Sequence, residues 1–290
     1  MSRAPVLSAY LQVAAGIAAL CVMDALVKYL ALRHGAPLTT FGRYASGTVI
    51  ALGVWAAQGR PGFGPGGLKA HLLRGALIAA MALSFFWAIT QLTLSLALTL
   101  AFIGPLLVPP LAALLLKEPM QPRFVVAGLV GFVGVLVAAG GMPDLTGTRL
   151  LAVLAAIGAA LLYGLAALVL RARAAVDGAT LITLMGAAVP AVLLTPALLD
   201  LGPLGQTDLM LMLAMGIIGN IGVQLLARGY VHLEAQASAV MEFTGLPWAA
   251  LLGWMVFDEA VAPATLLGAA IIAAACLWAA RTPPINPPPG

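Results

Sequence analysis

Long apolar stretches broken by short polar ones run through all 290 residues of the chain. A helix needs about 20 mostly apolar residues to cross the hydrocarbon layer, where its backbone polar groups must be satisfied within the segment. With the breaks marked by charges, Gly and Pro, this pattern predicts ten transmembrane helices. Their expected ranges are 8–31, 38–57, 74–91, 95–116, 124–140, 150–171, 179–199, 208–230, 236–257 and 264–281.

The polar interruptions are too short to hold a soluble domain. The longest of them, 58–70, is rich in Gly and Pro, which favour turns and loops. The Pro-rich stretch 283–290 has no apolar periodicity and is expected to be a disordered tail. The pattern therefore predicts an all-α integral membrane protein with almost nothing outside the bilayer.

Composition makes lipid the main solvent of this chain. Hydrophobic residues make up 62% of it and charged residues only 8%, whereas about a quarter of an average soluble chain is charged. The basic residues stand singly between apolar segments and form no patch, so nucleic acid is not an expected partner. Cys21 and Cys276 lie far apart in apolar runs, with no spacing typical of a disulfide framework or a metal site. We expect no cofactor and no metal.

The positions of Lys and Arg predict the orientation, because short cytoplasmic loops carry an excess of them. With a cytoplasmic N-terminus, ten basic residues fall on the inside and three on the outside, and Lys28 is left in the membrane. The inside set is Arg3, Arg60, Lys69, Arg74, Lys117, Arg123, Arg171, Arg173, Arg228 and Arg281, and the outside set is Arg33, Arg43 and Arg149. We expect a multi-pass protein of the cell inner membrane with both termini in the cytoplasm.

A weak internal repeat relates the two halves of the chain. Shifting the sequence by 141 residues places Phe102, Gly104, Leu111, Glu118 and Pro122 on Phe243, Gly245, Leu252, Glu259 and Pro263. Both units read as an apolar helix with a Gly-Pro element, an acidic turn, a Pro and a helix of small residues. The predicted repeats are 1–145 and 146–282. Five helices per repeat make the halves inverted, an arrangement in which transporters bind substrate near the midplane.

These two units, and the run from Ala227 to Ala239 before the ninth predicted helix, resemble the EamA type of the drug/metabolite transporter superfamily. The resemblance extends loosely over the whole chain, and it implies ten helices in two repeats. Within the superfamily the chain looks most like the YddG-type exporters of aromatic amino acids. The first repeat has Lys117-Glu118-Pro119 where the family more often has Gly-Glu, which is a departure from the pattern.

Ionisable residues inside a membrane span are costly, so each is a candidate for function. Asp24 and Lys28 lie one helical turn apart in the first predicted helix. They can serve a substrate, or they can form an intrahelical ion pair while Lys28 reaches outward to the interface. Arg43 opens the second predicted helix on the outer side, where it can meet the carboxylate of an amino acid, help to hold Asp24, or simply anchor the helix at the interface.

A polar stripe on the segment 208–230 is the most specific pattern in the sequence. Gly216, Asn220, Gln224 and Arg228 recur every four residues and so share one helix face. Asn220 falls near mid-span, and its amide offers a donor and an acceptor for an ammonium or a carboxylate. The stripe predicts either the wall of a hydrated cavity or a polar contact between packed helices.

Glu242 lies about two turns into the ninth predicted helix. A carboxylate held in apolar surroundings can exchange a proton near neutral pH, as proton-coupled export requires. Alternatively it pairs with Arg228 or Lys117 as a structural element. Tyr163 and Trp248 are candidate aromatic walls for a large side chain or a cation. Trp87 and Tyr44 are further candidates, although aromatic residues are more often core or interface belt.

Three classes of function compete at this point. The first is a secondary exporter of amino acids or similar small metabolites, driven by protons or by the substrate gradient, and working as a monomer. The second is an exporter of drugs or lipophilic cations. The third, a membrane enzyme, is disfavoured because the three histidines, His34, His71 and His232, all stand at helix ends without a nucleophile-and-base constellation. No P-loop motif is present, so ATP does not drive transport directly.

Overall fold

The computed structural model describes residues 3–101, 104, 113–114, 117, 122–138, 147–200, 202–233, 235–259 and 263–281. Within these ranges every element is a helix. The elements are α1 Arg3–His34, α2 Ala36–Ala57, α3 Gly67–Gln91, α4 Leu94–Ala101, α6 Pro122–Ala138, α7 Gly147–Leu193, the 3-10 helix η1 Thr195–Asp200, α8 Gln206–Tyr230, α9 Ala235–Glu242, α10 Gly245–Phe257 and α11 Pro263–Arg281. The all-helical fold class is thus confirmed for this part of the chain.

Five helical stretches are long and apolar enough to cross a membrane. They are Ser8–His34, Gly67–Gln91, Gly147–Leu193, Gln206–Tyr230 and Val240–Phe257. Shorter apolar helices run over Val125–Gly134 and Leu266–Ala275. Large apolar side chains such as Leu11, Val49 and Leu199 are exposed on the outside of the bundle, at 63%, 66% and 92%. An outer surface of this kind is suited to lipid and not to water.

The boundary between α1 and α2 follows from its residues. Gly35 has φ +80°, a left-handed conformation that glycine adopts at no steric cost and that ends a helix. Pro37 then stands in the first turn of α2, where its missing N–H has no helical partner to lose. A single residue therefore separates two antiparallel helices, and it lies where the sequence predicted a break.

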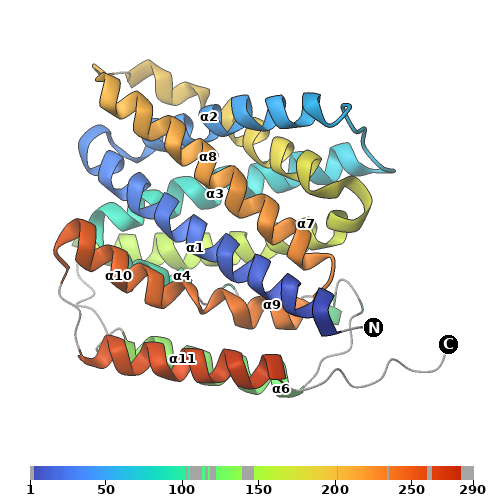
Figure 1. Ribbon diagram of the computed structural model, residues 1–290. Helices are drawn as coiled ribbons and strands as arrows, with labels where there is room; N and C mark the ends of the chain where they lie inside the picture. The colour runs from blue at the N-terminus through green and yellow to red at the C-terminus, as the bar shows by residue number, and fades with distance from the viewer. Residues whose placement is uncertain are drawn as a thin grey trace.

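Helix α7 covers two of the predicted helices, 150–171 and 179–199. A straight helix of its 47 residues would be about 70 Å long, more than twice the thickness of a hydrocarbon core. It is not straight, because Gly178 at φ 72° and ψ 162° breaks the helical path. The chain turns back at this glycine, as the yellow ribbon in Figure 1 shows. The predicted helix 179–199 ends earlier than expected, at Leu193, and η1 follows it.

The predicted helix 236–257 is wrong in one respect, because it is broken into α9 and α10 between Glu242 and Gly245. Pro247 stands in the first turn of α10, a position that tolerates proline. In a single continuous helix over 236–257 it would lie in the interior, where proline removes a backbone hydrogen bond. The Cys21 thiol of α1 donates to the carbonyl of Gly245, the first residue of α10, at 3.5 Å. The discontinuity therefore lies beside α1, in the interior of the bundle.

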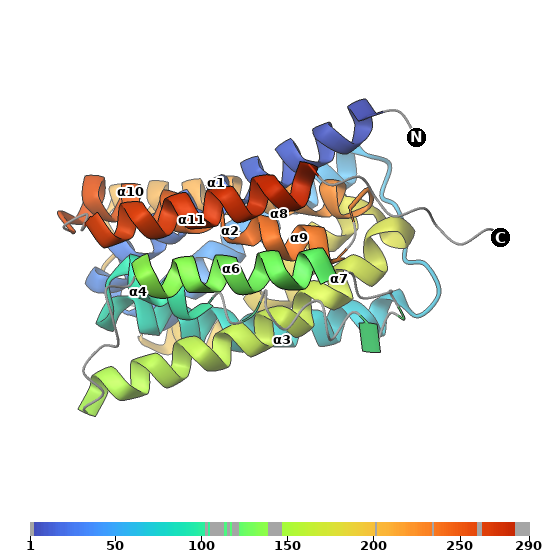
Figure 2. The ribbon, with the colours of Figure 1, turned by 90° about the horizontal axis from the view of Figure 1, so that it is seen from below.

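Helices from distant parts of the sequence pack side by side. The most extensive contacts join α3 with α7, α1 with α8, and α6 with α11. Figures 1 and 2 show α6 and α11 together along one side of the bundle. The start of α1 and the end of α11 lie at the same end of the molecule in both views. These pairings place the middle of α1, α3, α7 and α8 around a common interior.

Several predicted features lie outside the described residues. They are most of the fourth predicted helix between 102 and 116, the first-repeat residues Phe102, Pro105, Leu111 and Glu118, the loop 139–146 and the tail 282–290.

Candidate functional site

A cavity of about 220 Å³ lies in the interior of the bundle. Its wall is built from α1, α2, α3, α4, α7, α8 and the junction of α9 with α10. Most of the wall is apolar, with Phe85, Phe86, Met81 and Ile78 on α3. The charged lining residues are two acids, Asp24 and Glu242, and two bases, Arg43 and Arg74. A cavity with an apolar body and a few placed charges is typical of a small-molecule site.

The first charged pair joins α1 and α2. Asp24 and Arg43 both line the cavity and attract each other electrostatically. The Arg43 guanidinium stacks over the Tyr44 ring at 4.2 Å from its centroid, and its Nε lies 2.6 Å from Met23 Sδ. Gly219 on α8 leaves room for it, because a Cβ there would lie 3.1 Å from the Arg43 side chain. Arg43 is thus held by its surroundings on three sides.

Glu242 ends α9 at the helix break and faces two tyrosines. The hydroxyls of Tyr163 and Tyr230 donate to the same oxygen, Glu242 Oε1, at 2.7 and 2.5 Å. All three residues line the cavity. Among the described residues no Lys, Arg or His forms an ion pair with Glu242, so the sequence-level alternative of a pair with Arg228 or Lys117 is wrong. The carboxyl group is oriented by two neutral donors, both on the same oxygen.

Arg74 is a buried cation that forms no ion pair with a carboxylate of the described residues. It is only 4% exposed and lines the cavity from the first turns of α3. Its terminal nitrogen donates to the Ile182 carbonyl of α7 at 3.1 Å, while its buried Nε has no hydrogen-bond partner. The sequence predicted a helix over 74–91 with Arg74 at its start, whereas α3 begins at Gly67 and Arg74 is buried two turns into it. The sequence signal that could have found it is its position in a helix, one turn after His71.

Asn220 both lines the cavity and makes a polar contact between packed helices, the two alternatives that the polar stripe predicted. It is buried, lines the cavity, and its Nδ2 donates to the Gly47 carbonyl of α2 at 2.7 Å. Gly216, one turn earlier, contacts α2 so closely that a Cβ would lie 2.5 Å from Ser46 Oγ. The amide oxygen of Asn220 accepts no hydrogen bond within the described part of the chain. This residue therefore ties α8 to α2 and still presents an acceptor at the cavity.

Lys28 does not pair with Asp24, so the predicted intrahelical ion pair is wrong. Its Nζ lies 2.6 Å from Glu259 Oε1 and donates to the Leu92 carbonyl at 3.1 Å. The Leu94 N–H also donates to Glu259 at 3.2 Å. Because residues four apart on a helix point only roughly the same way, tertiary partners can separate them. Lys28 is buried but does not line the cavity.

Four more sequence candidates lie away from the cavity wall. Arg228 is exposed and donates to Gln224 at 3.3 Å, so the last two members of the polar stripe pair with each other. Trp248 is 42% exposed on the outside of α10. Trp87 is partly buried and packs in the hydrophobic core. The structure thus brings together Asp24, Arg43, Tyr163, Asn220 and Glu242 from the predicted set.

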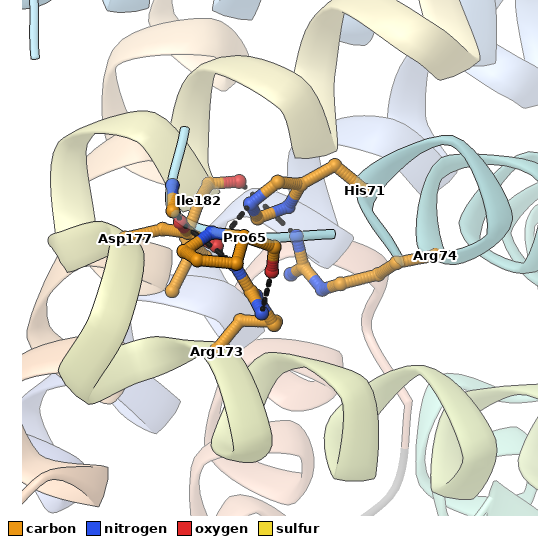
Figure 3. A network of polar contacts seen from close by, with 7 residues as sticks. Pro65, His71, Arg74, Arg173, Asp177 and Ile182 are labelled. Atoms are coloured by element: carbon orange, nitrogen blue, oxygen red, sulfur yellow. Dashed lines mark hydrogen bonds and ion pairs between the residues drawn. The ribbon is translucent and has the colours of Figure 1, made fainter. Parts of the chain in front are cut away.

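A buried polar network lies beside the cavity, where α3 meets the bend of α7 (Figure 3). The Asp177 carboxylate accepts from Gly64 N–H at 2.7 Å and from Arg173 Nε at 2.6 Å, and His71 Nε2 lies 2.9 Å from it. Arg173 also donates to the Pro65 carbonyl at 3.0 Å. The sequence did not predict this network, because its members come from three separate segments and only Arg173 and Asp177 have a helical i,i+4 spacing.

No group of three or more His, Cys, Asp or Glu residues in the described ranges is arranged to hold a metal ion. The cavity is therefore described by its charges, its hydroxyls and its apolar wall. A cavity lined in this way is suited to a small molecule, and its described lining residues include no nucleophile hydrogen-bonded to a base.

Comparison with known proteins is consistent with this geometry. Residues 7–140 match the EamA-like transporter family. The chain is 27% identical over 263 residues to the pseudopaline exporter CntI of Pseudomonas aeruginosa, which covers 90% of this chain and 92% of that protein. It is 26% identical to a riboflavin transporter of Vibrio cholerae over 92% of this chain and 91% of the relative. An S-adenosylmethionine uptake transporter of Rickettsia bellii is 27% identical over 88% of this chain and 87% of its own length.

The fold also matches a solved crystal structure with a TM-score of 0.75, at 18% identity, over 96% of this chain and 97% of the other. The long apolar helices are those of a multi-pass membrane protein. The EamA-like match covers residues 7–140, and the curated relatives, at 26–27% identity, are transporters of the drug/metabolite superfamily that this chain resembles over most of its length. The YddG-type specificity expected from the sequence is a finer assignment, which these relatives do not address.

Proposed function

We propose that this protein is a secondary active transporter that exports amino acids, aromatic ones included, or related small metabolites across the cell inner membrane by alternating access. The observation that carries the proposal is the cavity, because it combines both signs of charge with an aromatic and apolar wall. An amino acid has an ammonium, a carboxylate and a side chain. Asp24 and Glu242 suit the ammonium, and Arg43 and Arg74 suit the carboxylate. Phe85 and Phe86 suit a large apolar side chain.

The proposed topology has ten membrane crossings in two inverted halves, 1–145 and 146–282, with both termini in the cytoplasm. The three most extensive helix pairings, α3 with α7, α1 with α8 and α6 with α11, each join one half to the other. The cavity lies between the halves, and the break between α9 and α10 borders it. Broken helices at the interface of inverted repeats are typical of substrate sites in secondary transporters.

The energy source in this proposal is a proton gradient or the gradient of the substrate itself. Glu242 is the candidate proton-binding group, since it lines the cavity without a cationic partner among the described residues. The cavity is enclosed by helices of one chain, which supports a monomer as the functional unit. The relatives include an exporter and an uptake transporter, and export is the direction that we propose for this chain.

The test is transport by the purified protein in liposomes, loaded with a panel of amino acids and assayed with and without a pH gradient. We expect saturable efflux of at least one amino acid, competed by others and accelerated by the gradient if protons are coupled. Efflux of a lipophilic cation without movement of any amino acid would instead support the second candidate function, drug export. Asp24 and Glu242 in an aromatic cavity are the observation that favours this alternative.

Asn220 and Gln224 provide a matched pair of variants on one face of α8. Asn220→Ala removes a cavity amide and should lower transport about tenfold, since one hydrogen bond contributes about 1 to 1.5 kcal/mol. Gln224→Ala removes an amide one turn away that does not line the cavity, and transport should stay near the wild-type rate. Equal rates for both variants, with both proteins folded in the membrane, would show that Asn220 serves packing alone.

A further inference from the structure

Two opposite charges in the cavity lack charged partners. Arg74 forms no ion pair with any carboxylate of the described residues, and Glu242 forms none with any cation there. A buried charge that is neither paired nor fully hydrogen-bonded costs several kcal/mol. The other two lining charges, Asp24 and Arg43, form no ion pair within the described ranges either, but the Arg43 guanidinium is already packed over the Tyr44 ring and against Met23. Arg74, with its unpartnered Nε, and Glu242, with one carboxylate oxygen unused, are therefore groups that a charged ligand can compensate.

The acid nearest to Arg74 in Figure 3 is already engaged. Asp177 accepts two hydrogen bonds from Arg173, at 2.6 and 3.0 Å, and one from the Gly64 N–H, and it also contacts His71. Arg74 reaches past this network to the Ile182 carbonyl. Its guanidinium has five N–H donors, of which the backbone carbonyl of Ile182 takes one. Donors of this group are left for a ligand, and the buried Nε is among those without a partner.

The surroundings of Arg74 are shaped to admit its guanidinium. Gly186 on α7 also lines the cavity, and a Cβ at this position would lie 2.7 Å from a terminal nitrogen of Arg74. The missing side chain therefore leaves the space that Arg74 fills. Ile182 and Gly186 lie one turn apart, so a single face of α7 supports the group from two sides. A residue placed in this way is oriented before a ligand arrives.

We propose that Arg74 is the anion-binding residue of the cavity, and that it holds the carboxylate of a zwitterionic substrate whose ammonium group is held by Glu242. This inference rests on the proposed function and names its substrate class. The planar guanidinium fork matches a carboxylate with two parallel hydrogen bonds. The four lining charges sum to zero, which suits a ligand without net charge better than a phosphate or a simple cation. The tyrosines leave Glu242 Oε2 without a hydrogen bond from the described residues, free for an ammonium.

The test uses three probes that differ by one charged group. L-Phenylalanine carries both groups, phenethylamine lacks the carboxylate, and 3-phenylpropionate lacks the ammonium. Binding to the purified protein is measured by equilibrium binding and by the ligand-induced rise in melting temperature. Wild-type protein should bind L-phenylalanine at least about tenfold more tightly than either fragment, because a charge-assisted hydrogen bond contributes about 1.5 to 3 kcal/mol.

Arg74→Gln should weaken L-phenylalanine to the level of phenethylamine and leave phenethylamine binding unchanged. Glu242→Gln should give the mirror result with 3-phenylpropionate. Arg228→Gln is the matched control, since it removes an exposed arginine that does not line the cavity, and it should keep the full preference. Arg74→Lys keeps the charge without the fork, so it should lose affinity for L-phenylalanine severalfold and spare phenethylamine. This variant decides the question if Arg74→Gln does not fold.

A preference for L-phenylalanine over phenethylamine that survives in Arg74→Gln would overturn the inference. Together with a melting temperature several degrees below that of the wild type, it would identify Arg74 as a structural tie to Ile182. Wild-type protein that binds none of the three probes would also contradict it, whereas the proposed function falls only if no amino acid moves in the liposome panel. Binding of 3-phenylpropionate alone, lost in Arg74→Gln, would keep the anion site and exclude a zwitterion.

Discussion

At the residue scale, the Asp177 side chain joins three residues from separate parts of the chain, Gly64, His71 and Arg173. Its carboxylate is fully buried and meets donors from the loop before α3, from α3 itself and from α7. Asp177→Asn keeps the shape, but it places an amide N–H₂ donor among the donors that surround this side chain, and it removes the negative charge that compensates Arg173. We expect the melting temperature of the purified protein to fall by about 5 °C.

Asp258→Asn is the control for this substitution. Asp258 is exposed, and asparagine tolerates its left-handed φ of 56°. The melting temperature of this variant should stay within about 1 °C of the wild type, as for most surface substitutions. A melting temperature for Asp177→Asn equal to that of Asp258→Asn would mean that the network adds nothing to stability.

Single residues could be predicted from the sequence only in part. Asp24, Asn220 and Glu242 were identified because polar groups in apolar runs are rare, and the cavity includes them. The burial of Arg74 could not be predicted, because its place near a loop does not show that its side of the helix faces the interior of the bundle. Lys28 was paired with the wrong acid, since its partner Glu259 is 231 positions away in the sequence. Local spacing predicts neighbours on one helix, whereas these contacts depend on how helices pack.

At the scale of the element, the bend in α7 depends on one glycine. Gly178 has φ 72° and ψ 162°, a region that is open essentially to glycine alone. Gly158 on the same helix is the matched control, because a Cβ at either position meets nothing within 4 Å. Gly178→Ala should therefore destabilise the protein by about 1 to 3 kcal/mol through backbone strain alone. Gly158→Ala should be neutral or stabilising by up to about 1 kcal/mol.

Thermal unfolding of the two variants side by side measures this difference. Similar melting temperatures would show that the bend does not need its positive φ. Circular dichroism should report nearly the same helix content for both proteins, since the substitution changes one joint and not the helices around it.

Most helices were predictable because apolar length and breakers are local properties. Gly35 and Pro37 predicted the break before α2, and Gly178 predicted the break within α7. The division of 236–257 into α9 and α10 was less visible, since its apolar character continues through Pro247. A proline near mid-span permits either a kink or a new helix start. The packing of Cys21 against the Gly245 carbonyl is a tertiary contact that the sequence does not contain.

At the scale of the whole molecule, polar contacts tie α1 and α3 to the second half at two opposite ends. At one end, Lys28 of α1 meets Glu259 after α10 at 2.6 Å, and the Leu94 N–H joins them. At the other end, His71 of α3 meets Asp177 in the bend of α7. Alternating access requires that one end opens while the other stays closed. In the proposed topology the Lys28 end faces outward and the Asp177 end faces the cytoplasm.

Cys21 reports on access to the cavity from either end, because it lines the wall and the chain has only one other cysteine. In a Cys276→Ser background, right-side-out vesicles are treated with a small, membrane-impermeant thiol reagent. Glu259→Gln removes the ion pair with Lys28 and should speed modification of Cys21 from outside severalfold, since it shifts the equilibrium toward the outward-open state. Asp177→Asn should instead speed modification in inside-out vesicles.

Asp258→Asn, next to Glu259 but exposed, should leave both rates unchanged. Cys21→Ser should abolish the signal and so confirm the labelled position. If Glu259→Gln accelerates modification equally from both faces, the contact only holds the fold together, because a gate acts on one side. If each substitution opens the face opposite to the one expected, the rocking of the halves stands and the assignment of cytoplasmic termini is reversed.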